Sequence, residues 1–176
     1  DFAIQEALIL PETGWRTVQV TFTPPVQGVI AFRIYSRDTA ASEWSQHVSG
    51  TVVPASTLQV SSIDVSTIQA RCPDLLSGDE YYAHVDRLGL TFGTSFRALT
   101  RVWHNHEEAL GEMRLPEDLS DEAGRYGIHP AFLDSCFHVL GAPLVDEPDL
   151  VAYLLIGIER FQLQAKPGKS LWCHTR

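Results

Sequence analysis

One carboxylate stands inside an otherwise apolar run, GIHPAFLDSCFH, at residues 127–138. Pro130 suits the first position of a helix and the apolar pattern continues to Gly141, a common helix stop, so a helix is predicted over 130–140. Its apolar residues fall on nearly every side, and such a helix is usually wrapped by other structure. We therefore expect Asp134 to lie largely out of water, where burial raises the pKa of a carboxyl and makes it a proton donor.

Asp134 and His138 are the titratable pair with the clearest spacing for chemistry. They are four residues apart, which puts them on one face of a helix and lets the imidazole hydrogen-bond or orient the acid. A carboxyl held in this way is suited to general acid catalysis. The structural alternatives are a solvent-facing or capping role for Asp134 and a core role, with satisfied hydrogen bonds, for His138.

A second cluster, WHNHEE at residues 103–108, raises the question of a metal site. His104 and His106 alternate, so they would share one face of a strand. A zinc site needs three or four ligands, and no third or fourth ligand lies at supporting spacing. We therefore predict solvated polar residues here, and no metal.

The composition is that of a globular protein. The 176 residues, 44% of them hydrophobic, suffice for one full domain or two small layered ones. The net charge of −9 and the lack of any basic run argue against nucleic-acid and anionic-membrane binding, which need clustered Lys and Arg. No apolar stretch approaches the roughly 20 residues of a membrane span, and no secretory signal pattern opens the chain.

The cysteines bear on the cellular compartment. Cys72, Cys136 and Cys173 form an odd set without CxxC spacing, and two of them lie in apolar segments. Reduced, buried thiols are therefore expected, which favours a cytoplasmic protein.

The chain is predicted to mix antiparallel strands with a few helices. Three segments alternate apolar and polar residues and predict a meander: 15–22, 29–35 and 44–53. Two segments predict short helices, closed by Pro73 and Gly89: 64–71 and 79–88. Strand character returns over 96–115, and two closing strands follow the apolar helix. A meander of this kind has one apolar face that must be covered, and residues 1–54 offer nothing to cover it, so we expect further chain before Asp1.

Four segments resemble a known family in both order and spacing. They are WSQHVSGTV (44–52), LGLTFGTSF (88–96), HPAFLDSCFH (129–138) and SLWCH (170–174). The first three look like the WxxHxxG, LGLxYGPxF and HPxxxDxxxH/Q motifs of dehydratase domains from modular polyketide synthases, and the fourth resembles the closing strand of those domains. The resemblance covers nearly the whole chain.

The resemblance implies an α+β double hotdog fold, in which two antiparallel sheets each wrap a central apolar helix. Residues 1–55 would be the remaining strands of the N-terminal hotdog, 56–78 a linker, and 79–176 the C-terminal hotdog around the helix 130–140. The family's HxxxGxxxxP motif, which carries a catalytic histidine on the first hotdog, begins at none of the seven histidines here. The chain is therefore expected to lack about the first third of the domain, and to be inactive by itself.

The resemblance also implies a reaction. Such domains eliminate water from a β-hydroxyacyl thioester carried on the phosphopantetheine arm of an acyl carrier protein, which gives an α,β-unsaturated thioester. Asp134 matches the acid and His138 its orienting partner. The expected substrate-binding residues are His129, Pro130, Phe92, Gly93 and Phe96. No cofactor is expected in the domain itself, and the expected partners are the carrier protein, neighbouring synthase domains and a second copy of the domain.

Two departures from the family pattern keep alternatives open. The YGP sequence of the family is Phe92-Gly93-Thr94 here, so a tyrosine hydroxyl near the site and a rigid proline are lost. A pyran-forming cyclase or an enoyl isomerase on the same fold is one alternative. A non-catalytic hotdog module kept for contacts within a megasynthase is the other, since the catalytic histidine motif is missing.

Overall fold

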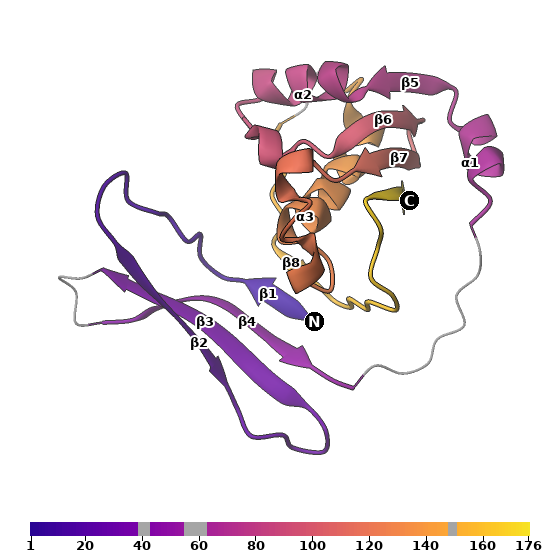
Figure 1. The fold of residues 1–176 in the computed structure, drawn as a ribbon. Helices are drawn as coiled ribbons and strands as arrows, with labels where there is room; N and C mark the ends of the chain where they lie inside the picture. The colour runs from indigo at the N-terminus through magenta and orange to yellow at the C-terminus, as the bar shows by residue number, and fades with distance from the viewer. Residues whose placement is uncertain (39–42, 55–62, 148–150) are drawn as a thin grey trace. The chain divides into compact units, whose positions relative to one another are not determined.

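The computed structural model describes residues 1–38, 43–54, 63–147 and 151–176, and the chain divides into two compact units. Unit 1 comprises Asp1–Gln59 and Leu154–Gln162, and unit 2 comprises Val60–Tyr153 and Leu163–Arg176. Each unit has an antiparallel sheet of its own (Figure 1).

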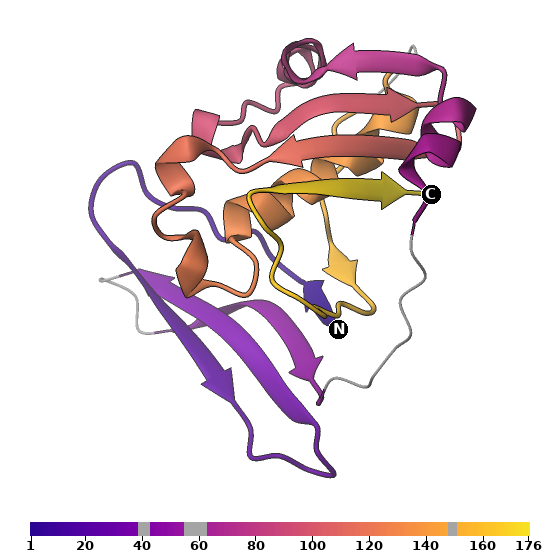
Figure 2. The ribbon, with the colours of Figure 1, turned by 45° about the vertical axis from the view of Figure 1, so that its right-hand side comes forward.

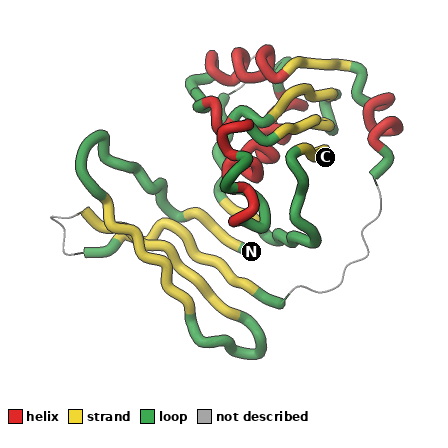
Figure 3. Tube along the Cα trace, viewed as in Figure 1, coloured by secondary structure: helices red, strands yellow, loops and turns green. Residues whose placement is uncertain are grey.

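Unit 1 is a five-stranded sheet in the order β2-β3-β4-β1-β8. Its strands are β1 (Phe2–Ile4), β2 (Arg16–Phe22), β3 (Ile30–Asp38), β4 (Ser45–Val52) and β8 (Gly157–Ile158). All neighbouring pairs are antiparallel, so the predicted meander is confirmed. No helix occurs among the described residues of this unit, as Figure 3 also shows.

One face of this sheet is apolar and partly open. Two rows of directly paired residues lie on it: Phe22, Phe32, Gly50 and Phe2, and then Val20, Ile34, Val48 and Ile4. Residues paired across strands share a face and would normally pack against a second layer. Phe22 is nevertheless 65% exposed and Val20 49% exposed.

Unit 2 is a four-stranded sheet in the order β5-β6-β7-β9, with helical segments on both faces. Its strands are β5 (Asp74–Ser77), β6 (Leu99–His104), β7 (Ala109–Arg114) and β9 (Ser170–Thr175). Its helical elements are α1 (Val65–Arg71), α2 (Gly78–Arg87), α3 (Pro130–His138) and the 3₁₀ turns η1 (Thr94–Phe96), η2 (Glu117–Leu119), η3 (Ala123–Arg125) and η4 (Val139–Leu144). Figure 2 shows the strands of this sheet with α3 beside them.

The core of unit 2 lies between the sheet and the segment formed by α3 and η4. Val102, Met113, Phe132 and Val139 are all at most 1% exposed and belong to one apolar cluster. A smaller cluster around Leu110 packs under α1 on the opposite face of the sheet, because successive strand residues point to opposite faces.

The two short helices begin and end close to where the sequence predicts. Asp64 caps α1, since its carboxylate accepts hydrogen bonds from the backbone N–H groups of Ser66 and Thr67. Ser77 and Glu80 form a reciprocal capping box at the start of α2. Gly89, at φ +85°, takes the left-handed conformation that closes this helix.

The structure differs from the sequence prediction in three places. The apolar helix is α-helical only to His138 and continues as the 3₁₀ turn η4, in which Pro143 lies; proline cannot donate the backbone hydrogen bond of a longer α-helix. The expected linker 56–78 contains α1 and β5, which pairs with β6 and so belongs to unit 2. Residues 154–162 belong to unit 1, because β8 pairs with β1.

A buried polar network lies at the end of unit 2 that contains the β6–β7 turn. The Glu108 side chain is 7% exposed and accepts two hydrogen bonds from Arg71, at 2.6 and 2.9 Å. Nε2 of His174 lies 3.0 Å from the same carboxylate. The hydrogen bonds from Arg71 and then from His174 lower the pKa of Glu108 to about 2. Glu108 therefore links α1, the β6–β7 turn and β9 through charge-assisted bonds.

Substitution of Glu108 by glutamine is expected to lower Tm by several degrees near pH 7. The folded-state pKa lies below the ordinary value of 4.5, so the stabilisation is fully present above about pH 4.5 and is lost as the pH falls towards about 2. The Tm difference between wild type and E108Q should therefore shrink on acidification, in thermal melts followed by circular dichroism. E107Q is the matched control, because Glu107 is exposed; a pH-independent difference for E108Q would contradict this account.

Candidate active site

The start of α3 is fixed by His129 and Pro130. His129 is the N-cap, with Nδ1 accepting the Ala131 N–H at 3.2 Å, and Pro130 takes the first helical position. Because Nδ1 accepts, the ring proton is on Nε2, which lies 3.1 Å from Oε1 of Glu122. Both ring nitrogens are thus engaged within the protein. The geometry agrees with the predicted role of His129 in fixing the helix start, and its role in substrate binding stays a prediction.

The rotation of α3 about its axis is fixed by Phe132 and Ser135. Phe132 is 1% exposed and anchors the helix in the core. The Ser135 hydroxyl, which is fully buried, lies 2.9 Å from the carbonyl oxygens of Phe96 and Ala131 and accepts the Ala98 N–H at 3.4 Å. These contacts join α3 to the segment that leads into β6, so they determine which side chains of the helix face away from the core.

Asp134 and His138 lie together, as their spacing predicts, but they differ sharply in burial. Nε2 of His138 is 3.2 Å from Oδ2 of Asp134, and the two side chains are 8% and 46% exposed respectively. The prediction that Asp134 lies largely out of water is therefore wrong for this chain: the apolar surface of α3 is packed around Phe132 and Ser135, while Asp134 is on the open side.

The contact between the two side chains is close but poorly aligned. Among the described residues, Nε2 of His138 has no hydrogen-bond partner, so the 3.2 Å approach to Asp134 lacks the alignment that a hydrogen bond needs. A buried ring nitrogen without a partner is unusual in a folded protein. Nε2 of His138 can thus form a hydrogen bond with a carboxyl group that rotates towards it.

Two aromatic residues pack against the imidazole of His138. The ring of Phe92 packs against it with centroids 4.1 Å apart, and the ring of Tyr82 meets it edge-on at 5.8 Å. The Tyr82 hydroxyl lies 3.3 Å from Nδ1. Tyr81 donates its hydroxyl hydrogen to the backbone carbonyl of His138 at 2.5 Å. The ring orientation is therefore set by α2 and by the loop that contains Phe92.

Tyr82 is the residue of this site that sequence reasoning missed. It is 2% exposed, and burial raises the pKa of its hydroxyl to about 12, so it stays protonated. The hydroxyl accepts the Leu99 N–H at 3.3 Å and approaches the Phe96 carbonyl at 3.4 Å. The available signal was a pair of adjacent tyrosines in an otherwise polar helical segment, residues 79–88. Two adjacent tyrosines in such a segment indicate that one face of the helix is buried.

The loop before β6 holds the other three residues predicted to bind substrate. Phe92 packs on His138, while Gly93 is exposed and is the N-cap residue of η1. The Phe96 side chain is 43% exposed. Arg97 fixes the loop by donating to the Phe92 carbonyl at 2.8 Å and to Asp86 at 3.1 Å. Of the three, Phe92 contacts the Asp134–His138 pair through the imidazole.

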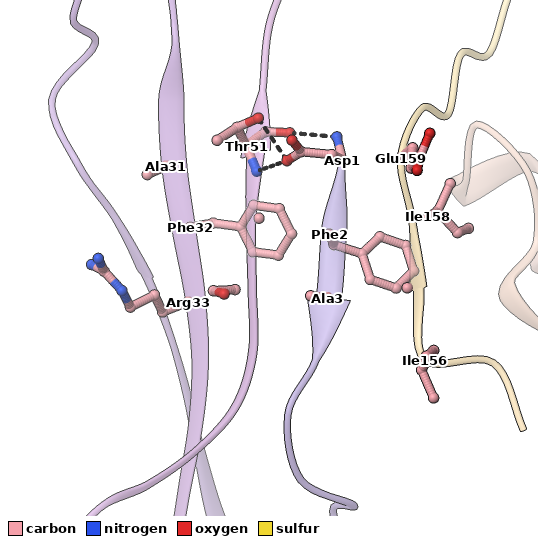
Figure 4. Close-up of a pocket in the computed structure, with 13 residues that line it drawn as sticks. Asp1, Phe2, Ala3, Ala31, Phe32, Arg33, Thr51, Ile156, Ile158 and Glu159 are labelled. Carbon is pink, nitrogen blue, oxygen red and sulfur yellow. Dashed lines mark hydrogen bonds between the residues drawn. The ribbon is translucent and has the colours of Figure 1, made fainter.

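Unit 1 has a groove of its own, about 750 Å³ in volume. It is lined by Asp1–Ala3, Ala31–Arg33, Ser49–Thr51 and Ile156–Glu159. Figure 4 shows the rings of Phe2 on β1 and Phe32 on β3, the two strands on either side of β4, and the Asp1 carboxylate, which accepts hydrogen bonds from the backbone N–H and the hydroxyl of Thr51 at 3.0 and 2.8 Å. None of the predicted site residues lines this groove.

Two further findings apply to the part of the chain that the structure describes. No group of three or more His, Cys, Asp or Glu side chains there is arranged to hold a metal ion. None of the helices in the same residues has the length and apolar character to cross a membrane.

Comparison with known families gives a match to the part of the chain that contains the Asp134–His138 pair. The family model of the polyketide synthase dehydratase N-terminal domain matches residues 62–176, which include α3 and the loop before β6. The chain belongs to the polyketide synthase dehydratase family. The resemblance that the four motifs indicate is thereby confirmed.

Characterised relatives of this dehydratase chain are much longer proteins. The spectinabilin polyketide synthase system protein NorA' of Streptomyces orinoci is 36% identical over 141 residues, which is 77% of this chain and 4% of that protein. Polyketide synthase GfsE of Streptomyces halstedii is 32% identical over 158 residues, which is 82% of this chain and again 4% of the relative. The chain thus spans a small part of each synthase.

Solved dehydratase domains share the fold. The domain from the CurJ module of the curacin polyketide synthase is 31% identical with a TM-score of 0.84, and the match covers 98% of this chain and 60% of that one. The CurF dehydratase is 28% identical with a TM-score of 0.86, and the match covers 97% of this chain and 62% of that one. The α+β double hotdog fold, with its first hotdog incomplete in this chain, is confirmed. For the CurK dehydratase, a histidine-to-phenylalanine and an aspartate-to-asparagine variant have been solved, each described as an inactive mutant.

Proposed function

We propose that this chain is the C-terminal part of a dehydratase domain and supplies its general acid, Asp134. The observation that carries the proposal is the Asp134–His138 pair, in which an open carboxyl lies 3.2 Å from a buried, firmly held imidazole. The inactivity described for an aspartate and a histidine variant of the CurK domain supports a reaction that needs one residue of each type. The whole-domain activity is dehydration of a β-hydroxyacyl thioester.

The proposed reaction needs a base and an acid. A histidine on the first hotdog removes the α-proton of the thioester, and the electron pair of that C–H bond becomes the new double bond. The bond from the β-carbon to its hydroxyl group breaks at the same time, and the proton of Asp134 goes to the departing oxygen, which leaves as water. Hydroxide is a poor leaving group, so this proton transfer is worth about 10²–10⁴ in rate.

His138 and Tyr82 can serve both protonation states that Asp134 must pass through. When Nδ1 carries the ring proton, it donates to the Tyr82 oxygen, the tyrosine donates to Phe96, and Nε2 is an acceptor that suits protonated Asp134. When Tyr82 donates to Nδ1 instead, the proton is on Nε2, which suits the carboxylate left after proton transfer. The distances of 3.3 and 3.4 Å from the tyrosine oxygen to its two partners support this exchange.

The remaining part of the domain would complete the first hotdog. The matching family is named an N-terminal domain, but the elements of this chain favour the C-terminal part: unit 2 has the apolar helix α3, and the described residues of unit 1 have no helix. The exposed Phe22 and Val20 side chains and the groove beside Phe32 fit a missing central helix of the first hotdog. We propose that the segment with this helix also brings the catalytic histidine and removes Asp134 from water.

The substrate carrier and partners follow from the same proposal. The acyl chain is carried on the phosphopantetheine arm of an acyl carrier protein, so the domain itself needs no bound cofactor. Neighbouring synthase domains and a second copy of the dehydratase are the other expected partners, in the cytoplasm. The acidic net charge of −9 gives no electrostatic help in docking a carrier protein that is itself acidic, so docking should depend on local contacts.

The test is mass spectrometry of an acyl carrier protein loaded with a β-hydroxyacyl chain. The dehydratase domain at the length of the solved domains should reduce the mass of the acyl group by one water, whereas the 176-residue chain alone should not. No loss of water by the longer, folded domain would overturn dehydration of that substrate.

A second candidate, ring closure or double-bond migration, is favoured by one observation. Phe92, where the family has tyrosine, packs directly on His138 with ring centroids 4.1 Å apart, so the missing hydroxyl belongs to the immediate surroundings of the site. A pyran-forming cyclase adds an internal hydroxyl to an enoyl thioester without change of mass. Chromatographic comparison of products from a hydroxy-enoyl thioester, with and without the domain, separates this reaction from dehydration.

Replacing Tyr82 with phenylalanine tests its role as a positioning residue. We expect kcat to fall by about 3–10-fold, because one hydrogen bond of ordinary strength is lost, and the pH profile of kcat to change, because Nδ1 of His138 loses its partner. Y81F is the comparison, since Tyr81 bonds the His138 backbone and not the imidazole. Equal pH profiles for Y82F and the wild type would mean that Tyr82 serves packing alone.

A further inference from the structure

Two of the three cysteines face each other across the core of unit 2. Cys136 lies on α3 and Cys173 on β9, and the Cys173 thiol donates a hydrogen bond to the backbone carbonyl of Cys136 at 3.5 Å. The Cys136 thiol in turn donates to the Phe132 carbonyl at 3.3 Å. Both cysteines are free and partly exposed, whereas Cys72 is fully buried beside α1, in the separate cluster of Leu110.

The two thiols also influence one another directly. Interaction with the Cys173 thiol lowers the pKa of Cys136, while that interaction and burial raise the pKa of Cys173 well above its usual range. The two thiols are therefore not equivalent, and Cys136 is the more acidic of the two. An asymmetric dithiol of this kind has an attacking and a resolving member.

We propose that Cys136 and Cys173 form a redox-sensitive dithiol that hydroperoxides convert to a reversible disulfide between α3 and β9. The thiolate of Cys136 attacks one peroxide oxygen, the O–O bond breaks, and hydroxide leaves and is protonated to water, which gives a sulfenic acid. The Cys173 sulfur then attacks the sulfenic sulfur and a second water leaves. In total, two thiols and one hydrogen peroxide give one disulfide and two waters.

The position of the dithiol gives the modification a structural consequence. Cys136 lies on α3 between Asp134 and His138, and a bond to Cys173 would tie this helix to the sheet. Such a bond joins two positions 37 apart in the sequence and so restricts the unfolded chain. Oxidation should therefore raise Tm by several degrees. A lower Tm after oxidation would mean that α3 must move to form the bond.

Tryptic mapping gives a direct test, because each cysteine falls in a different peptide: 72–87, 126–160 and 170–176. The chain is treated with hydrogen peroxide, alkylated and digested without reduction. We expect 126–160 joined to 170–176, lighter by two hydrogen atoms than the sum of the two peptides and released by dithiothreitol. C173S should abolish the crosslink and accumulate sulfenic acid on Cys136, which a dimedone probe detects, while C72S should leave the crosslink unchanged.

Three results would overturn the proposal. The first is oxidation of Cys136 to sulfinic acid in the wild type without any crosslink, which would mean that Cys173 cannot reach it. The second is a crosslink that contains 72–87, and the third is unreacted thiols in a protein whose circular dichroism shows it to be folded.

Discussion

Asparagine in place of Asp134 should reduce dehydration by a factor of about 10² to 10⁴ without loss of the fold. Asparagine matches the shape of the carboxyl but has no acidic proton to give to the departing hydroxyl. Because the two side chains are nearly the same in size and shape, the cost in stability should be small. The measurement is the rate at which the full-length domain removes water from a β-hydroxyacyl carrier protein, followed by mass spectrometry.

The matched control for this prediction is D121N. Asp121 is exposed in the loop before α3, so its substitution makes the same chemical change outside the site and should leave the rate unaltered. A D134N domain that keeps more than about a tenth of wild-type activity would exclude Asp134 as the acid. The search would then turn to another proton donor near His138.

Truncation of Phe132 to alanine should lower the free energy of unfolding by about 3–5 kcal/mol. Phe132 is 1% exposed and lies in the apolar cluster between α3 and the sheet. Its removal loses the transfer free energy of the ring and leaves a cavity. Urea unfolding followed by tryptophan fluorescence measures the change, and activity should fall in parallel because the same side chain seats the helix that carries Asp134.

L140A serves as the control for that experiment. Leu140 is an apolar residue just beyond α3, but it is 51% exposed, so its truncation should cost less than about 1 kcal/mol. Similar costs for the two variants would mean that α3 is not seated through Phe132. The helix would then have to be held mainly by its polar contacts, such as those of Ser135.

Local signals in the sequence predicted the individual elements well. Capping residues, alternation and helix stops are properties of a few neighbouring residues, and Asp64, Gly89 and Pro130 act in the structure as their types predict. The Asp134–His138 contact was also predictable, because residues four apart on a helix are neighbours whatever surrounds them.

Features that depend on distant pairing could not be predicted in the same way. The assignment of residues 154–162 to unit 1 depends on the pairing of β8 with β1, more than 150 residues away in the chain, and the exposure of Asp134 depends on which side of α3 is packed. Tyr82 was missed for the same reason: its position beneath His138 is a tertiary contact 56 residues apart, which no short motif contains.

The contacts of α3 lie within unit 2 and have a consequence for recombination between synthases. His129, Ser135 and His138 are held by residues between Tyr81 and Ala131, so the helix that carries Asp134 keeps these contacts when the rest of the domain is exchanged. A single crossover ahead of α1 would, however, leave β8 paired with a foreign β1. To obtain active chimaeric domains, two segments should therefore be exchanged together: the N-terminal strands and Leu154–Gln162. The recipient then keeps its own Asp134.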